Sequence, residues 1–475
     1  MDTATVQVDA GTLRGGSPSR VLRLSSTGRS AWDELRCGPV RSAAGAALAR
    51  RLTDAGLAHP RPPESAARLG VTVVIPVKER ADLLGNCLRS LGGDRPIVVV
   101  DDGSLDREAL ADIAAAHSAA LIRRPRCGGP AAARNTGLAA VDTDLVAFLD
   151  SDCITTPDWL DKLLPHFADP LVAAVAPRIV AIAGQTSAGR YGEVAGSLDM
   201  GAVEGRVVPG SRIAYVPSAA LVVRRNVLRD IGEFDERLRY GEDVDLIWRL
   251  HEAGLRIRYE PAARVYHREP RTWPELLARR FHYGTSAAPL AQRHPSASAP
   301  LIVHRWHSAT VLAALSGHPG VAALTFGLSM SQTRRTLRRV GLPTTDALTH
   351  TTRGLWQTWL GLGRFMIQFT GPLLVLLLAH RGSSPRRRTR RVSAAVLLLS
   401  TPVTAYFRTR PRLDPFRFAL GQLTDHIAYG AGVWAGCLRH RTAAPINPQL
   451  ARRPRRISGA ATGSAAAPSS SKGPQ

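Results

Sequence analysis

The sequence predicts an α/β protein built on a mostly parallel sheet with flanking helices, with a small module before the sheet and a helical region after it. From Gly70 onward, short β-branched runs alternate with longer segments of helical period, which is typical of a parallel sheet covered on both faces. Long apolar segments separated by arginine clusters follow residue 300. We therefore expect structured units over 1–65, 66–290 and 291–445, and a disordered, basic and serine-rich tail over 446–475.

The first unit is expected to be a small winged-helix-like module. Short strands are predicted around Val6 and over 21–24, and helices over 28–36 and 40–56. The proline-rich stretch at 60–63 then ends the module, because proline interrupts both helix and sheet.

In the second unit, apolar runs predict strands and the segments between them predict helices. The strands are expected over 71–76, 96–100, 120–122 and 145–149, and the helices over 81–91, 106–117, 131–140 and 157–168. Ligands bind at the carboxyl ends of the strands in such sheets, so the polar residues that follow each run are the candidate site.

Charge is distributed very unevenly along the 475 residues, whose net charge is +24. Residues 66–290 carry 28 basic and 29 acidic side chains, whereas residues 291–475 carry 25 and 3. A protein that binds nucleic acid through its main domain would be basic there, so we expect no nucleic-acid partner. The five cysteines are scattered and form no C-x-x-C pair, which predicts neither a disulfide framework nor a zinc site.

Membrane-associated helices are predicted by apolar segments near 308–331, 354–380, 392–407 and 419–438. Only the second segment approaches the ~20 apolar residues needed to cross a bilayer, so spanning helices, helices at the membrane surface and a soluble helical domain all remain open. Arginines beside apolar helices favour the cytoplasmic leaflet. We expect attachment to the cell membrane, with the second unit in the cytoplasm.

Two carboxylates one residue apart, Asp150 and Asp152, directly follow the strand expected over 145–149. Oxygen ligands at a strand end suit a hard cation such as Mg²⁺ or Mn²⁺, which also binds substrate phosphates. A solvated turn that caps a helix is the alternative reading.

The strand expected over 96–100 ends in the same way, at Asp101 and Asp102. With Pro76 and Glu79 at the end of the strand before it, these residues predict a nucleotide pocket, because carboxylates accept hydrogen bonds from base and ribose donors. A capped turn is the alternative.

Three candidates lie on helices. Arg134, one turn into a helix, either clamps a diphosphate or forms a surface ion pair with Asp150 or Asp152. Glu242 and Asp243 occupy the first turn of another helix, where Asp243 suits a general base, although the helix dipole alone also accounts for acidic residues there.

The region after the sheet supplies the last candidates. His267 is either a further metal ligand or a structural hydrogen-bond partner. Arg279 and Arg280 could neutralise a departing diphosphate, bind an acceptor or belong to a solvated basic face, and we expect Arg280 to be the one that stabilises the leaving diphosphate.

In this order, the motifs V-V-I-P, V-V-V-D-D-G-S, A-R-N-T-G, F-L-D-S-D and G-E-D-V-D-L-I-W-R-L resemble those of family 2 glycosyltransferases of the GT-A fold, over about 70 to 285. The resemblance implies that Asp101 and Asp102 hold the nucleoside and that Asp150 and Asp152 serve ribose and metal. It also implies that Asp243 is the general base of an inverting transfer. The Q-x-x-R-W motif of processive members is not present in that form, so polymer extrusion is not expected.

Within this family, the module, the arginine-rich tail and the run 279–290 are similar to the mycofactocin-system glycosyltransferases. That resemblance implies transfer of glucose, in β linkage, from a UDP-sugar to a redox cofactor derived from a ribosomal peptide, and gives residues 1–65 a role in peptide recognition. Two alternatives stay open. One is a membrane glycosyltransferase acting on a polyprenyl phosphate or cell-wall glycan, and the other is a non-catalytic module that binds nucleotide sugars.

Overall fold

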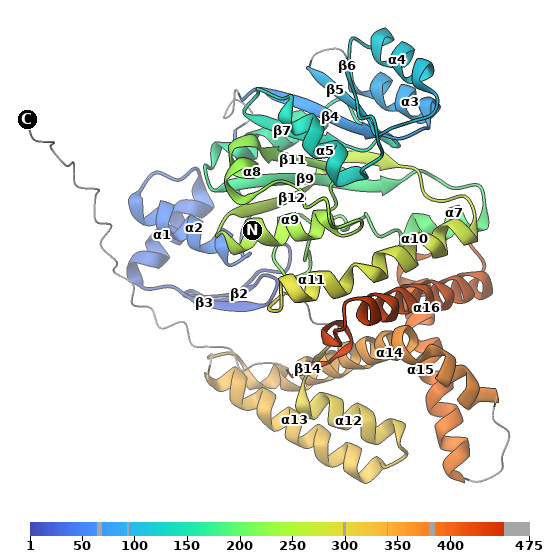
Figure 1. Cartoon of the computed structure of the whole chain (residues 1–475). Helices are drawn as coiled ribbons and strands as arrows, with labels where there is room; N and C mark the ends of the chain where they lie inside the picture. The colour runs from blue at the N-terminus through green and yellow to red at the C-terminus, as the bar shows by residue number, and fades with distance from the viewer. Residues whose placement is uncertain (64–68, 93–94, 298–300, 340, 380–384, 451–475) are drawn as a thin grey trace, which may run out of the picture.

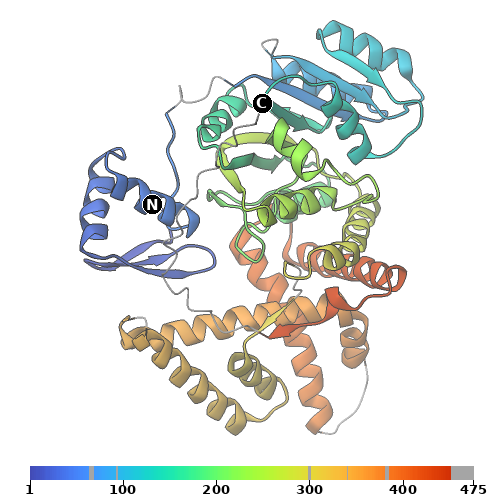
Figure 2. The same cartoon turned by 60° about the vertical axis from the view of Figure 1, so that its left-hand side comes forward.

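The computed structural model describes residues 1–63, 69–92, 95–297, 301–339, 341–379 and 385–450. Figures 1 and 2 show a central domain with the N-terminal module beside it and the helical region beneath it. The central domain therefore contacts both of the other regions.

The N-terminal module contains three strands, β1 (Val6–Asp9), β2 (Thr12–Gly15) and β3 (Arg20–Arg23), followed by α1 (Ser26–Cys37) and α2 (Ala43–Asp54). The strands form one antiparallel sheet in the order β1-β2-β3. The prediction of two strands missed β2, which is too short to show an alternating pattern, although Leu13 in it is fully buried. Ser25 and Ser42 cap the two helices by accepting hydrogen bonds from Gly28 N and Gly45 N.

The sheet of the central domain has the order β10-β12-β9-β11-β7-β4-β5-β6, with β8 paired to β12. Strands β4 to β7 run parallel, but β11 lies antiparallel between β7 and β9. The sheet is therefore mixed rather than mostly parallel, because a buried apolar run such as β11 does not encode strand direction. The strands are β4 (Val71–Val77), β5 (Ile97–Asp101), β6 (Ala120–Arg123), β7 (Leu145–Leu149), β8 (Cys153–Thr155), β9 (Val172–Ala181), β10 (Gly205–Arg206), β11 (Ala220–Arg224) and β12 (Arg256–His267).

Helices cover both faces of this sheet (Figure 1). The helix expected over 157–168 is divided into α6 and a 3₁₀ turn, since Pro165 has no amide hydrogen to continue an α-helix. The helices are α3 (Ala81–Leu91), α4 (Arg107–Ala116), α5 (Pro130–Ala139), α6 (Trp159–Leu163), α7 (Ser187–Ala195), α8 (Arg225–Ile231), α9 (Glu242–Glu252), α10 (Trp273–Thr285) and α11 (Ala287–Arg293).

The helical region contains α12 (Arg305–Leu315), α13 (Pro319–Arg339), α14 (Ala347–Ala379), α15 (Pro385–Thr409) and α16 (Pro415–Arg439). The apolar segment 308–331 forms two helices, because Gly317 adopts a left-handed conformation and Pro319 starts a new helix. Within the described residues, one segment, Thr344–Leu376, is long and apolar enough to cross a membrane.

A two-residue strand pair joins the segment before α12 to the segment after α16. Strand β13 (Ile302–Val303) pairs in parallel with β14 (Gln449–Leu450). Strand β14 lies at the start of the tail predicted over 446–475, and residues 451–475 lie outside the described residues.

Gly137 allows α5 to lie directly on the sheet. A Cβ atom there would collide with Val74 Cγ1 and lie 3.1 Å from Val100 Cγ2. We predict that Gly137→Ala lowers the free energy of unfolding by about 1–3 kcal/mol, because α5 must move off the sheet. Gly85→Ala is the matched control, since its nearest neighbour would lie 3.9 Å away. Denaturant unfolding followed by tryptophan fluorescence measures both, and equal midpoints would contradict the expectation.

Candidate active site

The candidate residues gather at one edge of the central sheet, where β4, β5 and β7 end. Asp150 directly follows β7, and Asp101 is the last residue of β5. The start of α9 reaches the same edge, since Asp150 N donates to Ala219 O and Ser218 N donates to Asp243 Oδ2 at 3.4 Å. Residues as far apart in the sequence as Arg134 and Glu242 are thus in contact here.

A buried arginine joins two of these carboxylates. Arg134 on α5 is 3% exposed and donates from Nη2 to Asp150 Oδ1 at 2.7 Å and from Nη1 to Glu242 Oε1 at 2.9 Å. Its guanidinium also lies 5.5 Å from the centre of the Phe234 ring. Burial opposes the charge, but Asp150 and Glu242 more than compensate and raise the pKa of Arg134. Of the two readings of Arg134, this geometry matches the ion pair with Asp150, except that the arginine is buried.

Asp243 lies beside this pair at the first turn of α9. Its Oδ1 accepts from Val244 N at 2.8 Å. Burial raises the pKa of the Asp243 carboxyl, and the charge of Asp150 adds to the effect while Arg134 opposes it. A half-buried carboxylate with a raised pKa is a stronger base than a solvated one, as general-base catalysis near neutral pH requires.

Asp152 and His267 meet on the other side of Asp150. His267 Nε2 lies 3.6 Å from Asp152 Oδ2, and its Nδ1 lies 3.3 Å from Glu269 Oε1. Burial opposes protonation of the imidazole, but these two carboxylates raise the pKa of His267 to about 9. Burial would likewise raise the pKa of Asp152, yet His267, Arg279 and Arg80 bring it below its ordinary value.

These donors fit a divalent cation that shares its coordination with a substrate. Among the described residues, no group of three or more acidic, histidine or cysteine side chains forms a complete metal site. Mg²⁺ is typically held by one or two carboxylates together with substrate phosphates, and manganese also accepts imidazole. Asp152 and His267 supply a donor set of that kind once the imidazole loses its proton.

Asp101 and Asp102 are satisfied by partners inside the protein. Asp101 is buried and accepts from Ser104 N at 2.8 Å and from Arg123. Asp102 accepts from Gly128 N and Gly129 N at 2.9 and 2.7 Å, at the start of α5. Both carboxylates therefore shape the loops of this edge, and their contact with a nucleoside stays a prediction.

The turn after β4 links the two acidic pairs. Pro76 lies half-buried within β4, whereas Glu79 and Arg80 both adopt left-handed backbone conformations, with φ of 57° and 60°. Glu79 N donates to Ser104 Oγ at 2.7 Å, and Arg80 Nη1 donates to Asp152 Oδ2 at 3.3 Å. Two strained residues in succession are uncommon outside functional sites. Here they direct the guanidinium of Arg80 toward Asp152.

Helix α10 covers the site, and it presents different residues from those expected. Arg280 does not face the carboxylates, because it is paired with Asp425 of α16. The charge of its neighbour Arg279 lowers the pKa of Asp152. Burial raises the pKa of Tyr283, and the nearby charges of Asp243 and Asp150 raise it further. Tyr283 and Glu269 were not among the candidates. Tyr283 lies four residues after Arg279 and Glu269 lies two residues after His267, so their proximity in the sequence could have identified them.

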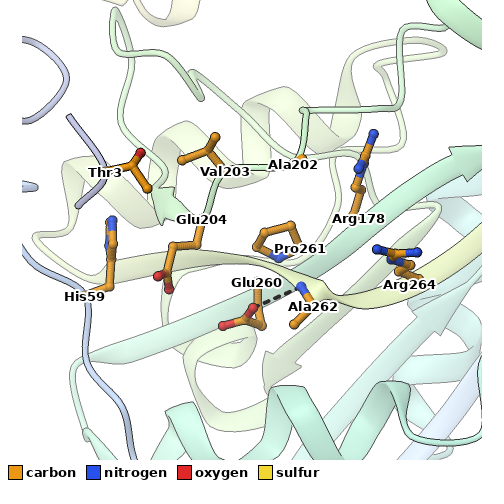
Figure 3. Close-up of a pocket in the computed structure, with 10 residues that line it drawn as sticks. All are labelled: Thr3, His59, Arg178, Ala202, Val203, Glu204, Glu260, Pro261, Ala262 and Arg264. Carbon is orange, nitrogen blue, oxygen red and sulfur yellow. Dashed lines mark hydrogen bonds between the residues drawn. The ribbon is translucent and has the colours of Figure 1, made fainter. Parts of the chain in front are cut away.

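A separate cavity of about 330 Å³ lies between the N-terminal module and β12 (Figure 3). Its acidic side chains have partners, since Glu204 pairs with Arg61 and Glu260 pairs with His166 at 3.2 Å. Glu260 stands before His267 on the same strand, and their partners on β9, Pro177 and Ala181, are four residues apart, so the two side chains are separated by about 13 Å along the strand. The Arg61–Glu204 pair attaches the module to the central domain, whereas the His166–Glu260 pair lies within the central domain.

Glu242 should make stability depend on pH. Burial, then the charge of Asp243, raises its pKa to about 7 against the effect of Arg134. Between about pH 4.5 and 7 the folded state then holds more protons than the unfolded state, so the free energy of unfolding falls as pH rises. We predict that Glu242→Gln removes this fall, whereas Glu108→Gln, at an exposed position, does not. Urea midpoints measured across this range test it, and parallel profiles for wild type and Glu242→Gln would contradict it.

Comparisons with known proteins agree with this geometry. The family model described as glycosyl transferase family 2 matches residues 72–232. The chain is 42% identical over 454 residues to the pre-mycofactocin glycosyltransferase of Mycobacterium tuberculosis, covering 93% of this chain and 95% of that protein. It is also 31% identical over 206 residues to the succinoglycan biosynthesis protein ExoU of Rhizobium meliloti, covering 41% and 60%.

Among solved structures, the mannosyltransferase PcManGT of Pyrobaculum calidifontis is similar at a TM-score of 0.39 and 18% identity, over 76% of this chain and 94% of that one. The identity to the Mycobacterium tuberculosis protein extends over almost the whole of both chains, beyond the segment that the family model matches. The chain belongs to the family 2 glycosyltransferases.

Proposed function

We propose that this enzyme transfers a sugar, glucose, from a UDP-sugar to pre-mycofactocin, a redox cofactor precursor derived from a ribosomal peptide, with inversion at the anomeric carbon. The proposed acceptor is supported by the 42% identity to a protein named pre-mycofactocin glycosyltransferase. The observation that carries the reaction type is the Arg134 pair, which brings Asp243 to the sheet edge that Asp150 and Asp152 occupy.

In the proposed reaction, Asp243 accepts the proton of the attacking acceptor hydroxyl at one of its carboxylate oxygens. The hydroxyl oxygen forms a bond to the anomeric carbon from the face opposite the diphosphate, and the bond to the diphosphate oxygen breaks. Ser218 N, at 3.4 Å from Asp243 Oδ2, helps to orient the carboxylate. General-base catalysis of this kind contributes about 10²–10⁴-fold to a rate.

The leaving diphosphate departs toward the Asp152 side of the site. Asp152 and His267 would hold Mg²⁺ or Mn²⁺ there, and such an ion supplies neutralisation of the charge that develops on the diphosphate. Arg279 replaces Arg280 as the arginine for this diphosphate in our proposal, because Asp152 is within its electrostatic influence and Arg280 is bound to Asp425.

We expect Asp243→Asn and Asp152→Ala to abolish sugar transfer by the purified enzyme, by 10³-fold or more relative to wild type. Both variants should remain folded, and chelation of divalent metal should abolish wild-type transfer. Asp142→Asn is the control, since this aspartate is fully exposed. Mass spectrometry of the products identifies the acceptor. A glycosylated polyprenyl phosphate instead of a glycosylated cofactor precursor would replace the proposed acceptor, and substantial transfer by either variant would refute its assigned role.

We also propose that the helical region is embedded in the membrane, because several of its helices expose large apolar side chains. Thr325 and Ser329 of α13 are buried, whereas Leu324 and Leu328 on the same helix face outward. Small polar residues between helices and large apolar residues outside are typical of helices surrounded by lipid. On α15 an exposed apolar stripe repeats at helical spacing, and it consists of Val392, Val396, Leu399, Val403 and Phe407.

The arginines of this region support the same placement. Arg388 and Arg390 begin α15 before the apolar stripe, and Arg408 follows the stripe at the end of the helix. Cations at both ends of an apolar helix interact with lipid headgroups, and anionic lipids attract them by ~1 kcal/mol each. We place the central domain on the cytoplasmic side, as arginine-rich flanks favour.

The stripe on α15 provides a test of this placement. Wild-type enzyme should float with phosphatidylglycerol-containing vesicles in a density gradient. The pair of changes Val396→Asp and Leu399→Asp should lower the floating fraction by about 10-fold or more, since each carboxylate costs roughly 3 kcal/mol in a lipid interior. Leu171→Asp, at an exposed leucine of the central domain, should float like wild type. Unchanged flotation of the α15 variant would contradict the placement.

A further inference from the structure

Helix α16, near the end of the described chain, packs against α10 backbone to backbone. A Cβ atom at Gly432 would collide with Phe281 O, and one at Gly284 of α10 would collide with Tyr429 O. One turn further on α16, a Cβ at Gly436 would lie 2.6 Å from Thr285 O. With no side chains between them, the two helices have no room to shift relative to each other. The position of α10 is therefore fixed by a helix that begins 130 residues after α10 ends.

A buried carboxylate strengthens this contact. Asp425 of α16 is 2% exposed and pairs with Arg280 of α10 through both carboxylate oxygens. Asp425 Oδ2 also accepts from the Tyr191 hydroxyl at 2.8 Å, and Arg280 Nη2 donates to Ala195 O at 3.0 Å. A buried charge is tolerated when it is paired and fully hydrogen-bonded, and these bonds join α16, α10 and α7.

Both helices that Asp425 holds also contact the active site. Helix α10 carries Arg279, whose charge lowers the pKa of Asp152. At the end of α7, Gly192 and Gly196 lie so close to Glu269 that a Cβ atom on either would come within 3.0 and 3.2 Å of its side chain. Glu269 in turn contacts His267 at 3.3 Å, and His267 contacts Asp152. A cavity lined by Gly192, Gly196, Glu269, Arg279 and Arg280 lies where the two helices meet.

We propose that Asp425 is a positioning residue for sugar transfer: by fixing α10 and α7 through Arg280 and Tyr191, it directs Arg279 at the diphosphate and holds Glu269 against His267. The C-terminal helical region is then part of the active centre as well as an attachment to lipid. This inference rests on the proposed function only for the identity of the leaving group, a nucleoside diphosphate.

The test compares the full-length Asp425→Asn enzyme with wild type. Asparagine keeps the size of the side chain and its acceptor for Tyr191 but loses the charge that holds Arg280. We expect kcat/KM for the sugar donor to fall about 100-fold, the loss that a misplacement of about 1 Å produces, with a rise in KM for the donor. Tyr191→Phe, a milder change that removes one hydrogen bond to Asp425, should shift both quantities in the same direction by a smaller factor.

A double-mutant cycle separates positioning from simple stabilisation. If Asp425 acts through Arg279, then Asp425→Asn should cause little further loss in an Arg279→Ala background, so the two losses do not add. A purely structural role predicts a lower melting temperature and a smaller fraction of active enzyme, with an unchanged KM. The losses in kcat/KM caused by the two single changes would then multiply in the double variant. That result would overturn the proposal. Asp414→Asn, at the exposed N-cap of the same helix, is the control and should leave KM unchanged.

Nucleotide binding keeps this test independent of the acceptor. Wild type and variants are titrated with UDP and with GDP in the presence of Mn²⁺, and Asp425→Asn should weaken binding of whichever nucleotide wild type prefers by about 10-fold or more. Tight binding without transfer to pre-mycofactocin by wild type would reject the proposed acceptor alone. Equal nucleotide affinity of wild type and Asp425→Asn would reject the positioning role alone.

Discussion

The active site depends on one buried guanidinium. Arg134 holds Asp150 at the end of β7 and Glu242 at the start of α9, two segments from different halves of the central domain. A buried arginine requires a paired carboxylate, and Arg134 has Asp150 and Glu242 within hydrogen-bond distance. The distance between Asp243, the proposed base, and the Asp152 side of the site is therefore influenced by this pair as well as by the two loops.

Much of the central domain could be predicted because its signals are local. The strands β4, β5 and β7 are apolar runs that end in polar residues, so the edge that carries Asp101 and Asp150 follows from the sequence. The direction of β11 could not be predicted, since β11 is as apolar as β7 and β9, to which it is antiparallel. The choice between Arg279 and Arg280 also required the structure, because it depends on Asp425, which is distant in sequence.

The two outer regions attach to the central domain in physically different ways. The N-terminal module is held by charge, as when Arg256 of β12 pairs with Asp54 of the module at 3.0 Å and with Asp169 at 2.6 Å. The helical region is held by shape, because glycines of α16 allow direct backbone contact with α10. Salt weakens exposed ion pairs and leaves close packing almost unchanged, so the two attachments respond differently to their surroundings.

The short pairing of β13 with β14 has a topological consequence. Because Ile302 and Gln449 are neighbours, the chain enters and leaves the helical region at one point. The two ends of the segment between these residues therefore meet. A change in the length of helices α12 to α15 would therefore alter the helical region without displacing the central sheet. In the proposed membrane placement, lateral pressure on the helical region would instead reach the proposed reaction centre along the contact between α16 and α10.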